Sequence, residues 1–208
     1  LKGNQLETRY LHLCDDELQE DYHDITTIVP QQSTASDSVM VQARIDQKKY
    51  LEQVQKMQEY IHKGDIYEAN FCMEFYAENA TIQPLEKFQK LNAISQPPFA
   101  VFLKNNQQYL LSATPERYLR KEGEDLISQP IKGTAKRYED PVADEKAKDD
   151  LASNPKERAE NIMITDLVRN DLSRTAQKGS VQVEELCGIY SFMQVHQMIS
   201  TITSKMDE

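Results

Sequence analysis

The order of hydrophobic and polar residues predicts three helices. Apolar side chains recur every three or four positions over residues 50–61, as on one face of a helix, and Gly64 suits the left-handed position just past its end. Residues 81–95 again place apolar side chains on one face. Asn154-Pro155 is a typical N-cap and first-turn pair, so it predicts a long helix that ends near residue 172.

Strands are predicted where the hydrophobic period falls to two, or where turn residues separate short apolar runs. Residues 65–78 alternate between an apolar face and a face that carries Glu68 and Asn70, which suits the lining of a cavity. Two hairpins are expected to follow, with their turns at Asn105-Asn106 and around Gly123. The six shorter predicted strands are residues 99–104, 107–113, 118–120, 125–128, 181–186 and 192–203. Hairpins followed by helices indicate an α+β fold rather than alternating βαβ units.

The first part of the chain lacks such a pattern. Residues 1–43 show little apolar periodicity, and residues 33–38 have the composition of a loop or linker. We therefore expect residues 1–43 to form an N-terminal arm or the end of a preceding domain. The chain does not begin with Met, and we expect it to be a piece of a longer protein.

Composition limits the classes of partner. The chain has 208 residues, 39% of them hydrophobic, and a formal net charge of -10. Nucleic acids and anionic membranes require clustered Lys and Arg, so neither is expected as a partner. The three cysteines lack the spacing of a metal or redox motif, which favours a reducing, cytoplasmic compartment, and Cys72 is expected to be a small core residue.

Lys132 is the first candidate for chemistry. It lies between Pro130 and Gly133, where proline restricts one backbone angle and glycine frees the next, which predicts a defined turn. A partly desolvated lysine in such a turn can lose its proton and act as a nucleophile or a base. Taken alone, the residue is more simply explained as a solvated lysine.

Glu160 is the second candidate. On the predicted helix it shares one largely apolar side with Met163, Ile164 and Leu167. An unpaired charge there would be costly, so Glu160 is expected to meet a cation or to bind Mg²⁺. A solvated helix surface beside Lys156 is the alternative. Further along the helix, Asp166 and Arg169 are expected to form an ion pair.

Glu116 is the third candidate, because it directly follows an apolar strand in the segment Thr114-Pro115-Glu116-Arg117. The end of a strand is a common position for a general acid or base. A salt bridge with Arg117 or Arg120 is an equally good explanation of the same carboxylate.

Four segments occur in an order that is typical of one enzyme family. They are GDIYEAN at residues 64–70, TPERY at 114–118, PIKGT at 130–134, and the helical run at 158–172. Together they resemble successive blocks of the chorismate-binding domain, over about residues 44–208. That family includes anthranilate synthase component I, aminodeoxychorismate synthase component I, isochorismate synthases and salicylate synthases. Lysine between Pro-Ile and Gly-Thr resembles the aminodeoxychorismate synthases, since anthranilate synthases typically have alanine there.

The resemblance implies a layered α+β fold, with large antiparallel sheets and helices outside, of which this chain holds the first part. It implies that Lys132 attacks C2 of chorismate while the C4 hydroxyl leaves and ammonia adds at C4. Glu116 would be the general acid and base, and Glu160 would hold Mg²⁺ on the substrate carboxylate. The residues that would contact the substrate are Glu68, Gly133 and Thr134.

The implied reaction is that of a transaminase-class, ammonia-dependent transferase that makes 4-amino-4-deoxychorismate for p-aminobenzoate and folate biosynthesis. A glutamine amidotransferase subunit would be the partner that supplies ammonia. The competing hypotheses are anthranilate synthase component I and a non-catalytic protein that keeps the chorismate-binding fold.

The sequence departs from the family pattern in three places. Glu68 stands where ammonia-using synthases usually have glutamine. Gln197 stands where relatives have histidine, and the adjacent His196 should face the opposite side of its strand. The chain ends at Glu208, before the glycine-rich region and the second Mg²⁺ glutamate of relatives, so we expect this piece alone to be unable to hold chorismate.

Overall fold

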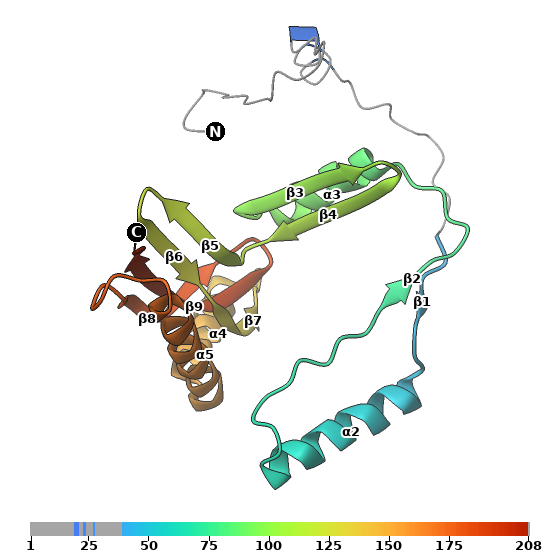
Figure 1. Cartoon of the computed structure of the whole chain (residues 1–208). Helices are drawn as coiled ribbons and strands as arrows, with labels where there is room; N and C mark the ends of the chain where they lie inside the picture. Colours follow the sequence, from blue (N-terminus) through green and yellow to red (C-terminus); the bar gives the residue numbers. More distant parts are fainter. Residues whose placement is uncertain (1–18, 21–22, 24–26, 28–38, 208) are drawn as a thin grey trace. The chain divides into compact units, whose positions relative to one another are not determined.

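A computed structural model of the chain describes residues 19–20, 23, 27 and 39–207 (Figure 1). The chain divides into two compact units, Leu1–Asp37 and Ser38–Glu208. In the first unit the described residues are helical. The predicted arm or preceding domain over residues 1–43 lies mostly outside the described residues and stays a prediction.

The predicted first helix is confirmed as α2, Gln47–Lys63. The side chain of Asp46 accepts a hydrogen bond from the backbone N–H of Lys49, which satisfies one of the free donors at the helix start. Gly64 ends the helix in the left-handed conformation, at φ +80°. Its N–H donates back to the carbonyl of Ile61, as the sequence led us to expect.

The predicted strand over residues 65–78 is wrong. Only β2, Phe75–Tyr76, is a strand, and it pairs with β1, Gln42–Ala43. Alternating side chains form a strand only where another strand satisfies the backbone groups, and among the described residues β1 is the partner available to this run. Because the run is irregular, Cys72 is exposed rather than a core residue.

The first hairpin is confirmed, with its turn one residue later than predicted. Strands β3, Phe99–Asn105, and β4, Gln108–Thr114, are antiparallel. The turn consists of Asn106 and Gln107, with Asn106 at φ +53°. Helix α3, Pro84–Ser95, packs on this hairpin, where the ring centroids of Phe88 and Phe102 lie 5.5 Å apart.

A five-stranded antiparallel sheet is the largest element of the second unit. Strand β9 runs through its middle: β7 and β6 pair with its first and second halves along one edge, and β8 pairs along the other. Strand β5 extends the sheet beyond β6. The strands are β5 Arg117–Glu122, β6 Asp125–Gln129, β7 Ile131–Lys136, β8 Gln182–Ser191 and β9 Val195–Lys205.

Helices α4, Pro141–Ser153, and α5, Pro155–Ser173, pack against one face of this sheet (Figure 1). Alternate residues of β9 point to this face and are buried, as the period of a strand requires. The sequence analysis missed α4, although Asp140-Pro141 is an N-cap and first-turn pair like Asn154-Pro155. The predicted α+β class, with antiparallel sheets and outer helices, is confirmed.

The core between this sheet and its helices consists of two small clusters. In the first, Leu126 of β6, Leu172 of α5 and Ile202 of β9 are buried together. In the second, Leu151 of α4 contacts two residues of the sheet, Cys187 and Met198. The lysine-bearing strand β7 is therefore supported by helices on one side and by β9 along its edge.

Substituting Ile202, whose side chain is fully buried, tests the first cluster. Ile202→Ala should lower the free energy of unfolding by about 2–5 kcal/mol, because it removes apolar contacts and leaves a cavity. Ile202→Val should cost about 0.5–1.5 kcal/mol, since it removes one methyl group. Urea unfolding followed by circular dichroism measures both losses, and equal losses would contradict the packing described here.

Candidate active site

Lys132 lies in strand β7, not in the turn that the sequence predicted. Pro130 comes directly before the strand, and its carbonyl accepts a hydrogen bond from the N–H of Ser200 on β9. Glycine does have the predicted special role, because Gly133 adopts φ +99° where the pairing of β7 with β9 shifts register. The lysine therefore projects from a bulge in a strand that pairs with β9 along one edge and contacts α5 on one face.

Asn161 on α5 holds this bulge from the helix side. Its side-chain amide donates to the carbonyl of Lys132, at 3.3 Å, and to the carbonyl of Met198, at 3.0 Å. Its side-chain oxygen accepts hydrogen bonds from the hydroxyl of Ser200 and the thiol of Cys187. Only 1% of Asn161 is exposed, so four hydrogen bonds satisfy a buried amide completely.

The buried face of α5 differs from the one expected. Asn161, Thr165 and Leu172 are its buried residues, whereas Leu167, predicted to share the apolar face with Glu160, is exposed. The sheet presents backbone carbonyls and a serine hydroxyl at this place, so polar side chains on the helix are needed to pair with them. Apolar periodicity does not detect a polar buried face, and the sequence analysis missed Asn161.

Glu68 is the direct partner of Lys132. The lysine Nζ lies 2.8 Å from Oε1 of the glutamate, and the two side chains are 23% and 26% exposed. Within the described part of the chain, the second carboxylate oxygen, Oε2, is buried and has no hydrogen-bond partner. Glu68 comes from the irregular run after α2, so tertiary structure joins two residues that are 64 positions apart.

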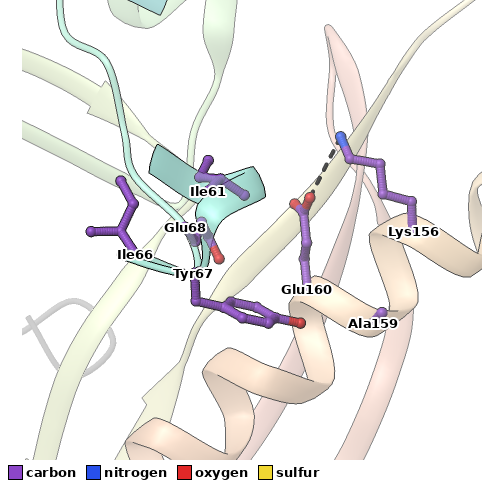
Figure 2. A pocket seen from close by; sticks show the side chains of 8 residues that line it. Ile61, Ile66, Tyr67, Glu68, Lys156, Ala159 and Glu160 are labelled. Atoms are coloured by element: carbon purple, nitrogen blue, oxygen red, sulfur yellow. Dashed lines mark ion pairs between the residues drawn. The ribbon is translucent and has the colours of Figure 1, made fainter. Parts of the chain in front are cut away.

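A cavity of about 440 Å³ lies between this irregular run and the start of α5 (Figure 2). Across it from Glu68, Lys156 and Glu160 form an ion pair at 3.5 Å. Glu160 thus meets a cation, but that cation is Lys156 of the same helix, a contact that also fits the alternative of a solvated helix surface. The remaining lining residues are Ile61, Gly64, Ile66, Tyr67 and Ala159.

Four predicted site residues lie outside the lining of this cavity: Lys132, which contacts the lining residue Glu68, and Glu116, Gly133 and Thr134. Glu116 is exposed between β4 and β5, and its N–H donates to the side chain of Thr114. Neither expected salt bridge of Glu116 is observed: Arg117 donates to Gln129, and Arg120 pairs with Glu122. Thr134 is exposed and lies opposite Gln197, while Gly133 packs against α5.

The fit of a metal ion can be judged from the oxygen ligands in the cavity. The described residues contain no group of three or more His, Cys, Asp or Glu side chains that could hold an ion. Glu160 nevertheless lines the cavity. One or two carboxylates, completed by water and substrate oxygens, are a typical set of ligands for Mg²⁺.

His196 belongs to a buried polar cluster on the helix side of the sheet. One ring nitrogen lies 3.1 Å from Oδ1 of Asp144 on α4, and the other lies 2.8 Å from the hydroxyl of Ser191. Arg137 donates to both oxygens of Asp144 and also to the carbonyl of Phe192. This cluster ties α4 to the ends of β8 and β9.

The neighbouring Gln197 has a buried side-chain oxygen without a hydrogen-bond partner among the described residues. Gln197 stands where the family pattern has histidine, so no imidazole is available at this position.

Comparison with known proteins gives a consistent result. The family model described as chorismate binding enzyme matches residues 3–208. Aminodeoxychorismate synthase component 1 from Escherichia coli strain K12 is 40% identical over 167 residues, which cover 80% of this chain and 37% of that protein. An anthranilate synthase component 1 from Haloarcula marismortui is 31% identical over 171 residues, or 82% of this chain and 35% of its own length. The chain thus spans just over a third of these relatives.

Solved structures show the same fold. The crystal structure of anthranilate synthase component I from Streptococcus pneumoniae TIGR4 superposes with a TM-score of 0.78 at 22% identity. The match covers 91% of this chain and 42% of that one. Among the helices of the part described here, none combines the length and the apolar character that crossing a membrane requires.

Gly133 provides a test of the bulge. A Cβ added there would lie 3.2 Å from the Cβ atoms of both Glu157 and Met198, in a backbone conformation that disfavours any side chain. Gly133→Ala should therefore cost about 1–3 kcal/mol in unfolding free energy for the backbone and a similar amount for the contacts. Gly123→Ala is the matched control, because Gly123 is at φ +60° with no atom within 4 Å. Equal losses in urea unfolding would show that the space at Gly133 is not tight.

The second test uses acid. Hydrogen bonds from Arg137, and then from the N–H of Tyr138, hold the pKa of Asp144 well below its usual range. A lowered pKa stabilises the fold above the unfolded value, about 3.9, and this stabilisation is lost as pH falls toward the folded value. Asp144→Asn should therefore be less stable than the unchanged protein at pH 7, with the difference shrinking below about pH 4. Urea unfolding at pH 7, 4 and 3 measures it, with Asp149→Asn on the exposed side of α4 as the control. A difference independent of pH would be the contrary result.

Proposed function

Because the chain belongs to the family of chorismate binding enzymes, we propose that it is part of an enzyme that aminates chorismate at C4. The product would be 4-amino-4-deoxychorismate, a precursor of p-aminobenzoate and folate. The observation that supports this most strongly is Lys132: an amine on a strand bulge, paired with a glutamate that lines a cavity of suitable size for a small substrate. The 40% identity to an aminodeoxychorismate synthase component 1 points in the same direction.

In this proposal the amine of Lys132 is the nucleophile. Its Nζ forms a bond to C2 of the ring while the bond between C4 and the hydroxyl breaks, and the two conjugated ring double bonds each shift by one position. Ammonia then bonds to C4 as the bond between C2 and Nζ breaks, which restores the lysine. A covalent intermediate of this kind replaces one difficult displacement by two easier steps.

Glu116 is the proposed general acid. Protonation of the departing hydroxyl lets it leave as water, and the carboxylate that results can take a proton from the nitrogen added at C4. Glu116 lies between β4 and β5, outside the lining of the cavity. Its proposed role therefore depends on the substrate reaching from Lys132 to this strand end.

The residues of the cavity also suit Mg²⁺, and Glu160 is the residue proposed to hold it. A bound Mg²⁺ would neutralise and orient the carboxylates of a dianionic substrate. Lys156 would be released from Glu160 in that state and could contact a substrate carboxylate itself. Gly133, Thr134 and Glu68 are the other residues proposed to border the substrate.

The whole protein is proposed to work with a glutamine amidotransferase subunit that supplies ammonia. The names of several relatives designate them as component 1, which implies a second component. Because this chain spans just over a third of those relatives, activity is a property of the longer protein. Cys72 and Cys187 are free thiols, which supports a reducing, cytoplasmic location for it.

Anthranilate synthesis is the second candidate. It is supported by identities of 30–32% to three anthranilate synthases and by the fold shared with a fourth. The two reactions use the same substrate and the same nitrogen source, so only the product distinguishes them.

The test is a product assay on the full-length protein with chorismate, Mg²⁺ and ammonium. The unchanged protein should form 4-amino-4-deoxychorismate, and Lys132→Ala should reduce its rate by at least about 100-fold, because it removes the nucleophile. Lys136→Ala, which alters an exposed lysine on the same strand, is the matched control and should retain the rate. Chromatography with mass detection identifies the product.

Anthranilate as the product would transfer the protein to the second candidate. The absence of turnover, with or without an amidotransferase, would favour a non-catalytic protein with this fold. Chelation of Mg²⁺ should abolish product formation, and activity that resists chelation would contradict the proposed metal.

A further inference from the structure

We propose that Glu68 is the proton acceptor for Lys132 when its amine becomes a nucleophile, an inference that rests on the proposed function. Lysine must lose a proton before it can attack carbon. The group that receives this proton has to lie within hydrogen-bonding distance of Nζ. Oε1 of Glu68 lies 2.8 Å away, which meets this requirement directly.

The charged groups around Lys132 favour Glu68 for this role. Glu160 is paired with Lys156 at 3.5 Å, so its negative charge is already balanced by that ammonium group. Glu157 packs against the backbone at Gly133. Asp144 is bound by Arg137 and His196 on the helix side of the sheet. Glu68 is the carboxylate for which the structure records a contact with Nζ.

Glu68 also keeps one acceptor atom free. Its Oε2 is buried and has no hydrogen-bond partner among the described residues. No hydrogen bond from another group to Oε2 therefore has to break when the carboxylate takes up the proton.

Lys132 and Glu68 also lie on different kinds of backbone, a strand and an irregular segment. Lys132 lies on a strand whose carbonyl is held by Asn161, so its position is determined. Glu68 lies on residues 65–74, which belong to no helix or strand. It can therefore move away from Nζ after the transfer without breaking a ladder of hydrogen bonds, and this exposes the nitrogen lone pair to the substrate.

The proposed step balances in protons. An N–H bond of the Lys132 ammonium breaks and an O–H bond of Glu68 forms, which converts an ion pair into two neutral groups. The free electron pair on Nζ then forms the bond to C2. When that bond breaks again, the neutral amine takes its proton back from Glu68. Glu116 handles the separate proton of the hydroxyl that leaves C4.

Two rates measured on the full-length protein test this role. The first is the labelling of Lys132 by trinitrobenzenesulfonate at pH 8, quantified by peptide mass spectrometry. The second is the turnover of chorismate with Mg²⁺ and ammonium. Glu68→Gln removes the charge with little change in shape, and Glu68→Asp keeps a carboxylate. Glu78→Gln, at an exposed residue further along the chain, is the control.

The expected result is a divergence between the two rates. In Glu68→Gln, labelling should become about threefold faster or more, because the negative charge that holds the ammonium is gone. Turnover should become about 100-fold slower, because the proton has no acceptor. Glu68→Asp should recover part of the turnover, and the control should change neither rate.

Any other combination of the two rates contradicts the proposed role of Glu68 as proton acceptor. If both rates rise in Glu68→Gln, the glutamate only restrains the lysine. If labelling does not change, the ion pair does not exist in solution. If Glu68→Gln leaves turnover unchanged, Glu68 is not the proton acceptor, although the ion pair with Lys132 can still exist. If the unchanged protein forms no 4-amino-4-deoxychorismate, the proposed function fails, and the role of Glu68 fails with it.

Discussion

The buried amide of Asn161 is the interaction on which the arrangement of the site depends. It binds the carbonyl of Lys132 on β7 and the carbonyl of Met198 on β9, and it accepts from Ser200 and Cys187. One helix residue thus connects three strands of the sheet at the point where the ladder between β7 and β9 is irregular. Carbonyls left free there would lack partners in a buried place, which is costly, and the amide removes that cost.

The irregularity gives the lysine its position. Gly133 allows a backbone conformation that other residues adopt rarely, and its missing side chain lets the start of α5 approach β7 closely. As a consequence, Glu160 and Lys156 on the first turns of α5 lie beside the same cavity as Glu68, the partner of Lys132. The amine is thereby fixed by the sheet, whereas its carboxylate partner lies on a segment that no sheet or helix holds. Such a pair can be rearranged by a substrate at a small structural cost.

On the same face of the sheet, a second polar cluster anchors α4. Asp144 accepts from Arg137 and contacts His196, and the ring of His196 also contacts Ser191. The cluster is charged yet well paired, which is the condition for keeping ionised groups in a partly buried place. The two helices are therefore held on the sheet by polar interactions as well as by the small apolar clusters around Ile202 and Met198.

Local signals in the sequence were enough to determine α2, α3, α5 and the two hairpins, because caps, turns and short apolar periods act over a few residues. The motif with Lys132 was also visible, since proline restricts the backbone and glycine allows conformations closed to other residues wherever they occur. Only the tertiary structure decided the rest. Residues 65–78 alternate like a strand but find a strand partner only at β1, and the buried face of α5 is polar because the sheet below it offers carbonyls. Lys132 and Glu68, 64 positions apart, meet for the same reason: pairing between distant residues depends on how the elements pack, which no local pattern of side chains encodes.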